Sequence, residues 1–377
     1  MHIRLWTGLA TTVAAVGLAV TAGALPAAAA TGPTASFTVS LLVDLGAFNA
    51  DASSSVPGQT PITSYTWDFG DFDGDVVTTA GPQNGKVYGH GGVYTVKLTV
   101  TDAAGLTDST TRQVSAFPKL STTALLGSNL RYVTAEAGGG QPLIANRASV
   151  GGTWERLDLV DVGGDIGFRS QANGKYVTVD PATTRLTANG SAAERFQRVD
   201  TLNGAFALRS TTTGKYLSSN NGGSPLTADR PAVGAWEQFY RPTSESGLNK
   251  HPFSASNGYV KYISAESAGG RPLIANRRSP GQWETYDQID AGKGWIALLS
   301  HANNRFVTAE AGGNQPLIAN RTSVGDWELF KIGYADGLQS LRANANGKYV
   351  TADLTNGGTL IANRTEVGDW ERFTVLA

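Results

Sequence analysis

Residues 346–373 read NGKYVTADLTNGGTLIANRTEVGDWERF, and related stretches recur six times between residues 119 and 377. An aromatic residue anchors each copy at intervals of 40 to 46 positions: Tyr132, Tyr176, Tyr216, Tyr262, Phe306 and Tyr349. A Glu that stands two positions before a large apolar residue also recurs: Glu155, Glu194, Glu237, Glu284, Glu328 and Glu371. Such a period indicates six copies of one supersecondary unit.

Each unit predicts four short β-strands. The Asn-Gly pairs at 173–174 and 346–347 are strong hairpin signals. Four strands per unit of about 43 residues fit either a six-bladed propeller or two β-trefoils of three units each. The polar, Pro-containing stretch 241–254 separates the third unit from the fourth. This division favours two trefoils, at residues 119–242 and 253–377.

The units also resemble those of a known family. The stretches are YVTAEAGGGQPLIANRASVGGTWERL at 132–157, FVTAEAGGNQPLIANRTSVGDWELF at 306–330 and YLSSNNGGSPLTADRPAVGAWEQF at 216–239. They are similar to the repeats of fascin-type β-trefoils, and the resemblance extends over all six units. It implies either crosslinking of protein filaments, as by fascins, or a place beside polysaccharide-degrading enzymes in secreted bacterial proteins. The Gln-x-Trp signature of ricin-type lectins is absent.

Five of the six units carry an Arg before their last loop and a Trp six or seven residues later. The pairs are Arg147 with Trp154, Arg230 with Trp236, Arg277 with Trp283, Arg321 with Trp327, and Arg364 with Trp370. The second unit has Gly190 and Ala193 instead, so we expect each Arg to pack on its Trp and the adjacent Glu to pair with the same Arg. The Arg–Trp pair is either a structural contact that stabilises each unit or a binding platform for a sugar ring.

A second candidate site is the Gly-rich turn. Units one, four and five carry Glu136, Glu266 and Glu310 ahead of glycine runs. Exposed turns on a rigid scaffold often bind ligands. The alternative is that the glycines only supply positive φ angles.

Residues 33–116 predict a β-sandwich of six or seven strands. Apolar and polar residues alternate in SYTWDF at 64–69 and in YTVKLTVTD at 94–102. FNADASSS at 48–55, ITSYTWDFGDFDGD at 62–75 and VYGHGGVYTVKLTVTDAAGLTDSTTRQV at 87–114 resemble the PKD domain, an immunoglobulin-like module that serves as a spacer. The family usually has Gly directly after the second Asp, whereas Phe72 and Asp73 here precede Gly74.

The acidic residues of this domain raise the question of a calcium site. An EF-hand loop that began at Asp71 would need Gly and Glu where Val76 and Pro82 stand, so that interpretation fails. A calcium site of another kind, with Asn49 or Asp51, and a solvated acidic hairpin remain as alternatives. We assign no metal and no cofactor to the chain.

Residues 1–30 have one Arg, an apolar middle and an Ala run before residue 31, as in a secretory signal peptide. An uncleaved anchor is the alternative, and no later segment is long and apolar enough to span a membrane. The chain has no Cys and a formal net charge of −1, which does not fit a nucleic-acid binder.

Catalytic motifs are also missing. The sequence has no thiol, no His-x-x-x-His pair and no Gly-x-Ser-x-Gly elbow, and the four His residues are isolated in the sequence. We therefore expect an all-β, secreted or cell-surface protein without catalytic residues that binds extracellular polysaccharide or cell-wall glycan. The alternatives are a protein-binding or filament-bridging surface protein and a remote glycosidase.

Overall fold

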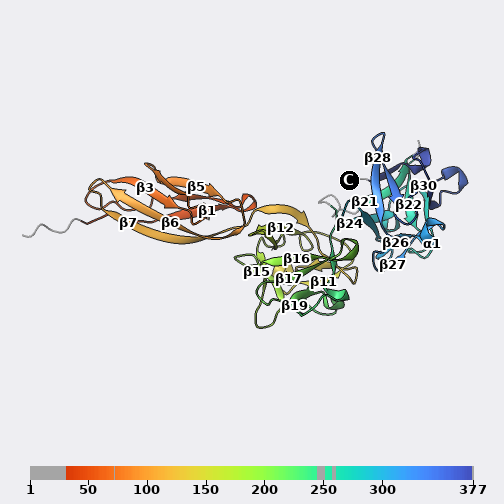
Figure 1. The fold of residues 1–377 in the computed structure, drawn as a ribbon, viewed down its shortest axis with the longest axis horizontal. Helices are drawn as coiled ribbons and strands as arrows, with labels where there is room; N and C mark the ends of the chain where they lie inside the picture. Colours follow the sequence, from red (N-terminus) through yellow and green to blue (C-terminus); the bar gives the residue numbers. More distant parts are fainter. Residues whose placement is uncertain (1–30, 72, 244–250, 257–259, 376–377) are drawn as a thin grey trace, which may run out of the picture.

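The structure, a computed structural model, describes residues 31–71, 73–243, 251–256 and 260–375. The expected signal segment 1–30 lies outside them. Figure 1 shows a β-sandwich at one end, followed by two rounded β domains, which we call trefoil 1 (β8–β20) and trefoil 2 (β21–β32). No helix in the described residues is both long and apolar enough to cross a membrane.

The first domain packs two antiparallel sheets, ordered β1-β2-β5 and β4-β3-β6-β7. Their strands are β1 (Thr38–Leu42), β2 (Ala47–Asp51), β3 (Ile62–Asp68), β4 (Val76–Thr79), β5 (Gln83–Val87), β6 (Gly92–Asp102) and β7 (Thr107–Ala116). The alternation in β6 places Val96, Leu98 and Val100 in the core, where Trp67 is fully buried. The predicted immunoglobulin-like sandwich is confirmed.

Trefoil 1 consists of β8 (Lys119–Thr123), β9 (Leu126–Gly127), β10 (Tyr132–Thr134), β11 (Ile144–Arg147), β12 (Leu157–Val162), β13 (Asp165–Ser170), β14 (Tyr176–Val179), β15 (Leu186–Gly190), β16 (Phe196–Asp200), β17 (Phe206–Ser210), β18 (Tyr216–Ser218), β19 (Thr227–Arg230) and β20 (Phe239–Tyr240). Its three hairpins, β10–β11, β14–β15 and β18–β19, are antiparallel and each has a bulge beside the anchor Tyr.

Trefoil 2 repeats the plan with β21 (His251–Ser256), β22 (Val260–Ala265), β23 (Leu273–Arg277), β24 (Thr285–Asp290), β25 (Ile296–Ser300), β26 (Arg305–Ala309), α1 (Glu310–Gly313), β27 (Leu317–Arg321), β28 (Phe330–Ala335), β29 (Leu338–Ala343), β30 (Tyr349–Ala352), β31 (Leu360–Arg364) and β32 (Phe373–Val375). Its three hairpins are β22–β23, β26–β27 and β30–β31.

A closed ring of backbone hydrogen bonds decides between the trefoil and the propeller. The N–H of Leu143 donates to Leu186 O, that of Leu186 to Leu226 O and that of Leu226 to Leu143 O, over 2.8 to 3.1 Å. Three units thus meet around one pseudo-threefold axis. In trefoil 2 the corresponding strands β23, β27 and β31 also contact one another pairwise. The chain is all-β and has two trefoils, as the three-plus-three division predicted.

The two junctions between domains use equivalent positions. Phe117, just before trefoil 1, packs edge-on against Tyr176 with ring centroids 5.0 Å apart. Tyr240, just before trefoil 2, packs on Phe306 at 5.7 Å in the same way. Asp161 N–H then donates to Pro118 O, and Asp290 N–H donates to Arg241 O, both at 2.9 Å. Each trefoil therefore contacts the preceding domain through the same face.

A buried polar cluster lies at the second junction. Tyr132 Oη of trefoil 1 donates a hydrogen bond of 2.6 Å to Asp287 Oδ2 of trefoil 2. His301 Nε2 lies 2.8 Å from Asp287 Oδ1, and all three side chains are buried. His301, isolated in the sequence, therefore has a carboxylate partner in the fold.

Candidate ligand-binding site

The repeated Glu is a buried structural residue. All six members are at most 8% exposed. In five units its Oε2 accepts the N–H of a Gly that begins the loop: Gly151 for Glu155, Gly234 for Glu237, Gly281 for Glu284, Gly325 for Glu328 and Gly368 for Glu371, over 2.7 to 3.0 Å. These bonds hold the short turn that carries the preceding Trp.

The Arg of each of these units ends the second hairpin strand and approaches the same Glu. Arg Nε lies 3.7 to 3.8 Å from the Glu Oε1 in the pairs Arg147–Glu155, Arg230–Glu237, Arg277–Glu284, Arg321–Glu328 and Arg364–Glu371. The expected pairing of the Glu with the Arg is thus confirmed. Each Arg side chain remains 40 to 50% exposed, so its outer edge faces solvent.

The same Arg also contacts the Gly-rich turn in units one, four and five. Arg Nη2 lies 2.9 Å from a carboxylate oxygen of Glu136, Glu266 or Glu310 in the respective unit. The Asn before each Arg donates to that carboxylate as well, through Asn146, Asn276 and Asn320 at 2.6 to 3.0 Å. The two candidate sites of the sequence are therefore one site. The Asn was missed, although it precedes the Arg in four of the six units.

The Trp rings do not accept the Arg guanidinium. The cation–π contacts within the described residues join other pairs, such as Lys331 with Trp295 at 4.6 Å. The expected Arg–Trp stack is therefore not formed, because neighbouring carboxylates attract the guanidinium more strongly than a ring face does. The rings remain available: Trp154, Trp236, Trp283 and Trp327 are 37 to 46% exposed, and Trp370 is half-buried.

The Gly-rich turn has a structural role alongside the site. Gly313 has a φ of +83°, and a Cβ there would lie 2.2 Å from Asn346 Nδ2 of the next unit. Asn346 in turn donates to Ala362 O at 2.7 Å. Gly313 is therefore required by the close approach of the two units. A Cβ at the neighbouring Gly312 would lie 3.9 Å from Trp327 Nε1, so Gly312 is next to the Trp of its own unit.

Complete sites with Glu, Asn, Arg and Trp thus occur in units one, four and five. Unit three has Asn220 in place of the turn Glu, and its Oδ1 accepts from Arg230 at 3.0 Å. Unit six has Asp353, which accepts from its own turn at Thr355 N–H. These two units keep the Arg and the Trp but lack the second glutamate.

Unit two is used for domain contact. Ala193, at the place of the Trp, packs with Ala192 on a cluster that includes Phe117 and Tyr176 at the junction with the first domain. Gly190, at the place of the Arg, lines a hollow with Leu41 and Val43 of the first domain. The absence of the Arg–Trp pair in this unit therefore accompanies its role in docking.

The acidic cluster of the first domain holds an ammonium group. Lys86 Nζ lies 2.5 Å from Asp71 Oδ2 and 2.8 Å from Asp75 Oδ2. The hydrogen bond from Lys86 lowers the pKa of Asp71, and the bonds to Asp71 and Asp75 raise that of Lys86. No three His, Asp or Glu residues of the described chain are grouped to hold a metal. The arrangement gives no support to a calcium site at Asp71.

Residues 28–116 match the PKD domain family. The first domain is a PKD domain. It is similar to the PKD1 domain of Vibrio anguillarum Epp, at 31% identity over 23% of this chain and 96% of that one, with a TM-score of 0.21. The PKD1 domain of the Vibrio cholerae metalloprotease PrtV is 29% identical over 23% of this chain and 98% of that one, with a TM-score of 0.20.

The designed three-fold symmetric protein ThreeFoil is 20% identical over 34% of this chain and 97% of that one, with a TM-score of 0.31. The chain matches no curated protein. The assignment of two trefoils rests on the strand pairing and the ring of hydrogen bonds described above, and the function of the trefoils has to be argued from their own site.

Proposed function

We propose that this chain is a secreted, non-catalytic protein that binds polysaccharide or cell-wall glycan through the complete sites of units one, four and five. The observation that carries the proposal is the partial exposure of Trp154, Trp283 and Trp327 beside a fixed Arg, Asn and Glu. Sugars present apolar ring faces edged by hydroxyl groups, so they fit an exposed aromatic ring flanked by hydrogen-bonding side chains.

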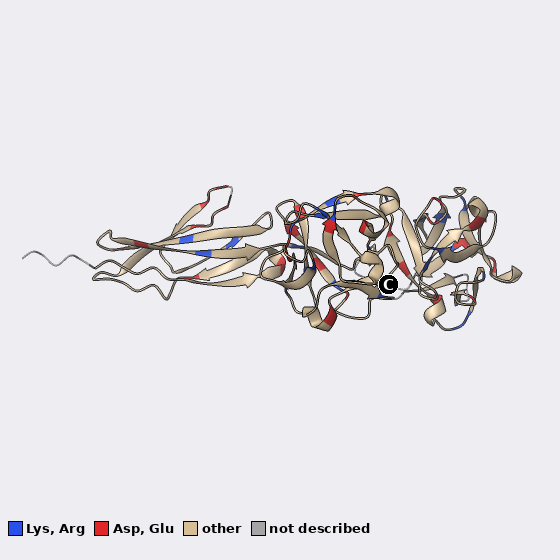
Figure 2. Cartoon of the chain, turned by 90° about the horizontal axis from the view of Figure 1, so that it is seen from below, with Lys and Arg blue, Asp and Glu red and all other residues tan. Residues whose placement is uncertain are grey.

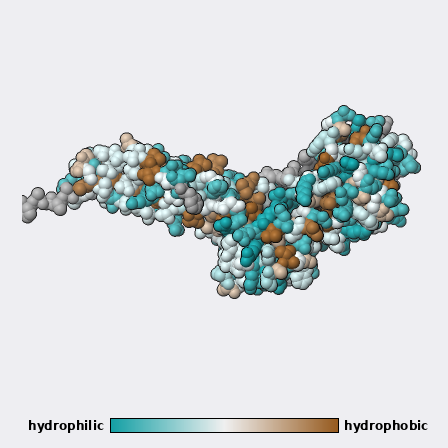
Figure 3. Space-filling view, viewed as in Figure 1, coloured by the Kyte–Doolittle hydropathy of each residue, from teal (hydrophilic) through white to brown (hydrophobic). Residues whose placement is uncertain are grey.

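The surface supports a neutral ligand over a charged one. Lys and Arg alternate with Asp and Glu along all three domains in Figure 2, and neither sign forms a continuous stripe. The face shown in Figure 3 is mostly hydrophilic with small, separate hydrophobic groups. Within each complete site one Arg lies between two glutamates, so the site has no net positive charge. These features favour hydroxyl-rich ligands over polyanions and over large apolar partners.

The carboxylates of the sites also favour binding over catalysis. The buried Glu of each complete unit is bonded to a Gly N–H, and the turn Glu is bonded to Arg and Asn. Groups that are held in this way stabilise the turn and orient the Arg. The PKD domain would act as a spacer ahead of the trefoils.

Pull-down of the full chain with insoluble chitin, cellulose, xylan and peptidoglycan sacculi tests the proposal. We expect selective retention, a loss of a few fold for Trp327→Ala and a far larger loss for the triple Ala variant of Trp154, Trp283 and Trp327, because several weak sites reinforce one another. Tyr334→Ala is the matched control, since Tyr334 is 76% exposed and lies outside the sites.

Two outcomes would contradict the proposal. Retention by none of the four materials would shift the assignment to protein partners, and the resemblance to fascin-type trefoils would then favour bridging of filaments. Retention that survives in the folded triple variant would place the glycan site elsewhere on the chain.

A further inference from the structure

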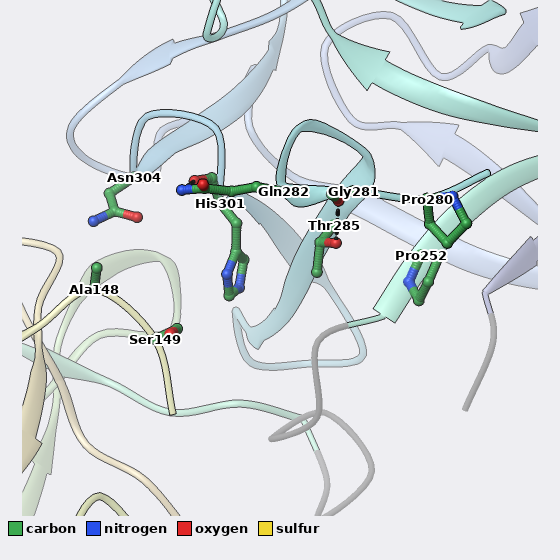
Figure 4. A pocket seen from close by; sticks show the side chains of 9 residues that line it. All are labelled: Ala148, Ser149, Pro252, Pro280, Gly281, Gln282, Thr285, His301 and Asn304. Carbon is green, nitrogen blue, oxygen red and sulfur yellow. Dashed lines mark hydrogen bonds between the residues drawn. The ribbon is translucent and has the colours of Figure 1, made fainter. Parts of the chain in front are cut away.

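A cavity of about 380 Å³ lies between the two trefoils, outside the repeated sites. Its lining includes Ala148 of trefoil 1 and Pro252, Pro280, Gln282, His301 and Asn304 of trefoil 2. Figure 4 shows the His301 and Asn304 side chains on the side of the cavity that faces the loop of Ala148. The volume lies within the range of about 300–1,000 Å³ that is usual for small-molecule sites.

The cavity lies between the loops of two complete units. Ala148 belongs to the loop that joins Arg147 to Trp154 in unit one. Pro280 and Gln282 belong to the loop that leads to Trp283 in unit four. The cavity is therefore lined by the loops that carry both Trp residues, and the inference that follows rests on the proposed glycan binding.

The walls of the cavity are fixed before any ligand arrives. Asp287 is 3% exposed and lies 2.8 Å from His301 Nε2. Tyr132 Oη of trefoil 1 donates to the same carboxylate at 2.6 Å, which ties the two trefoils together behind the His301 side chain. A preformed wall reduces the ordering cost of binding.

The lining combines two carboxamides with an apolar surface. Gln282 Nε2 donates to His301 O at 3.0 Å, which leaves its side-chain oxygen to accept from a ligand. The Asn304 side chain lines the cavity as a second carboxamide, and Ala148, Pro252 and Pro280 add apolar surface. An acetamido group has one N–H donor, one carbonyl acceptor and one methyl group, and it matches this set.

We propose that the cavity between the trefoils binds an N-acetylated sugar residue of a neutral glycan chain. Gln282 accepts the acetamido N–H, Asn304 donates to its carbonyl oxygen, and the methyl group packs against Ala148, which lies on the same side of the cavity in Figure 4. The cavity then selects for N-acetylated chains, while the exposed Trp rings hold any chain that presents sugar faces.

The corresponding turn of trefoil 1 shows which substitutions at His301 and Asn304 are compatible with the fold. Gln171 and Gly174 occupy the positions of His301 and Asn304 in the corresponding turn of trefoil 1. Gln171 Nε2 donates to the buried Asp158 at 2.8 Å, so His301→Gln keeps a donor for Asp287. Asn304 has a φ of +53°, which Asn304→Gly accommodates without strain.

The experiment is calorimetric titration of the full chain with N-acetylchitohexaose and with cellohexaose, which differ in the acetamido group at carbon 2. We expect tighter binding of N-acetylchitohexaose by the native chain. Asn304→Gly should reduce that preference by about three- to ten-fold, the effect of about one hydrogen bond, while binding of cellohexaose stays the same. His301→Gln should reduce the preference as well, and Trp327→Ala should weaken the binding of both oligomers equally.

The outcomes separate this inference from the proposed function. Equal binding of the two oligomers by the native chain, or a preference that persists in Asn304→Gly, overturns the cavity assignment and leaves glycan binding intact. Binding of neither oligomer overturns the cavity assignment, and the pull-down with insoluble glycans then decides independently whether the proposed function stands.

Discussion

Replacing Tyr132 with Phe should loosen the two trefoils from each other. The Tyr132 ring is fully buried, and its hydroxyl donates to Asp287 Oδ2 at 2.6 Å. Phe keeps the ring, which fits because Phe306 is the anchor aromatic of unit five. The variant therefore removes one hydrogen bond to a buried carboxylate, and such a bond contributes about 1.5–3 kcal/mol.

A loss of about 2 kcal/mol in a trefoil pair of this size lowers the unfolding midpoint by roughly 4–8 °C. Differential scanning calorimetry of the full chain measures that midpoint. Tyr262→Phe is the control, because Tyr262 holds the equivalent place in trefoil 2 but is only half-buried. An unchanged midpoint for Tyr132→Phe, or the same shift in both variants, would refute the role of this bond.

Alkaline pH provides a second check on the same residue. Burial, with the nearby Asp287 charge, raises the pKa of Tyr132 well above its ordinary value of 10.0. Above pH 10 the phenol ionises in the unfolded chain, which lowers the free energy of the unfolded state, whereas in the folded chain the phenol stays protonated. The native protein should therefore lose stability faster than Tyr132→Phe above pH 10, and the difference between their unfolding midpoints should become smaller. A difference in midpoint that stays constant up to pH 11 would contradict the raised pKa of Tyr132.

Three further changes test other parts of the fold. Burial alone would raise the pKa of Asp158, but the pKa is lowered by hydrogen bonds from Gln171, Arg169, Lys119 and Thr122. The stability that the Asp158 carboxylate contributes is therefore lost as the pH falls below its ordinary pKa of 3.8. Asp158→Asn should flatten the acid side of a plot of melting temperature against pH. Glu328→Ala removes the acceptor of the Gly325 N–H at 2.7 Å and should cost about 1–3 kcal/mol in urea unfolding, whereas Glu366→Ala, an exposed control, should cost nothing measurable. Ala193→Trp overfills the cluster at the junction between the PKD domain and trefoil 1, and calorimetry should show a loss of about 1–3 kcal/mol there.

Much of the architecture followed from the sequence because its signals are local. The anchor aromatics and the stretch 241–254 predicted three-plus-three units, and the hydrogen-bonded ring through Leu143, Leu186 and Leu226 has that arrangement. Periodicity along the chain reports which residues share a structural role. It does not report which side chains of different units meet.

The site was predicted only in part for this reason. The Arg, Trp and Glu residues were recognised because they recur together, but the partner of each Arg was not the Trp. Arg277, for example, lies between Glu266 and Glu284, at 2.9 and 3.7 Å. A guanidinium between two carboxylates is favoured over a stack on a ring that is open to water. Asn276 recurs beside the Arg and was the overlooked signal.

The junctions were beyond prediction because they depend on single departures from the repeat. Tyr132 reads as one more anchor aromatic, and His301 reads as a turn residue where trefoil 1 has Gln171. Only the fold brings these two residues, 169 positions apart, onto the same carboxylate of Asp287. A contact made once between two units leaves no periodic trace.

The same face of each trefoil thus contacts the preceding domain, yet the unit at the contact differs between the two trefoils. Unit two has four positions from Gly190 to Glu194 where unit five has seven from Arg321 to Glu328, and its shortened loop packs against the PKD junction. Unit five makes its contact through Val324, whose carbonyl accepts from Asn203 of trefoil 1 at 2.8 Å, and it keeps Trp327 39% exposed. Docking therefore does not require loss of the Arg–Trp pair, because unit five takes part in the junction and keeps both Arg321 and Trp327.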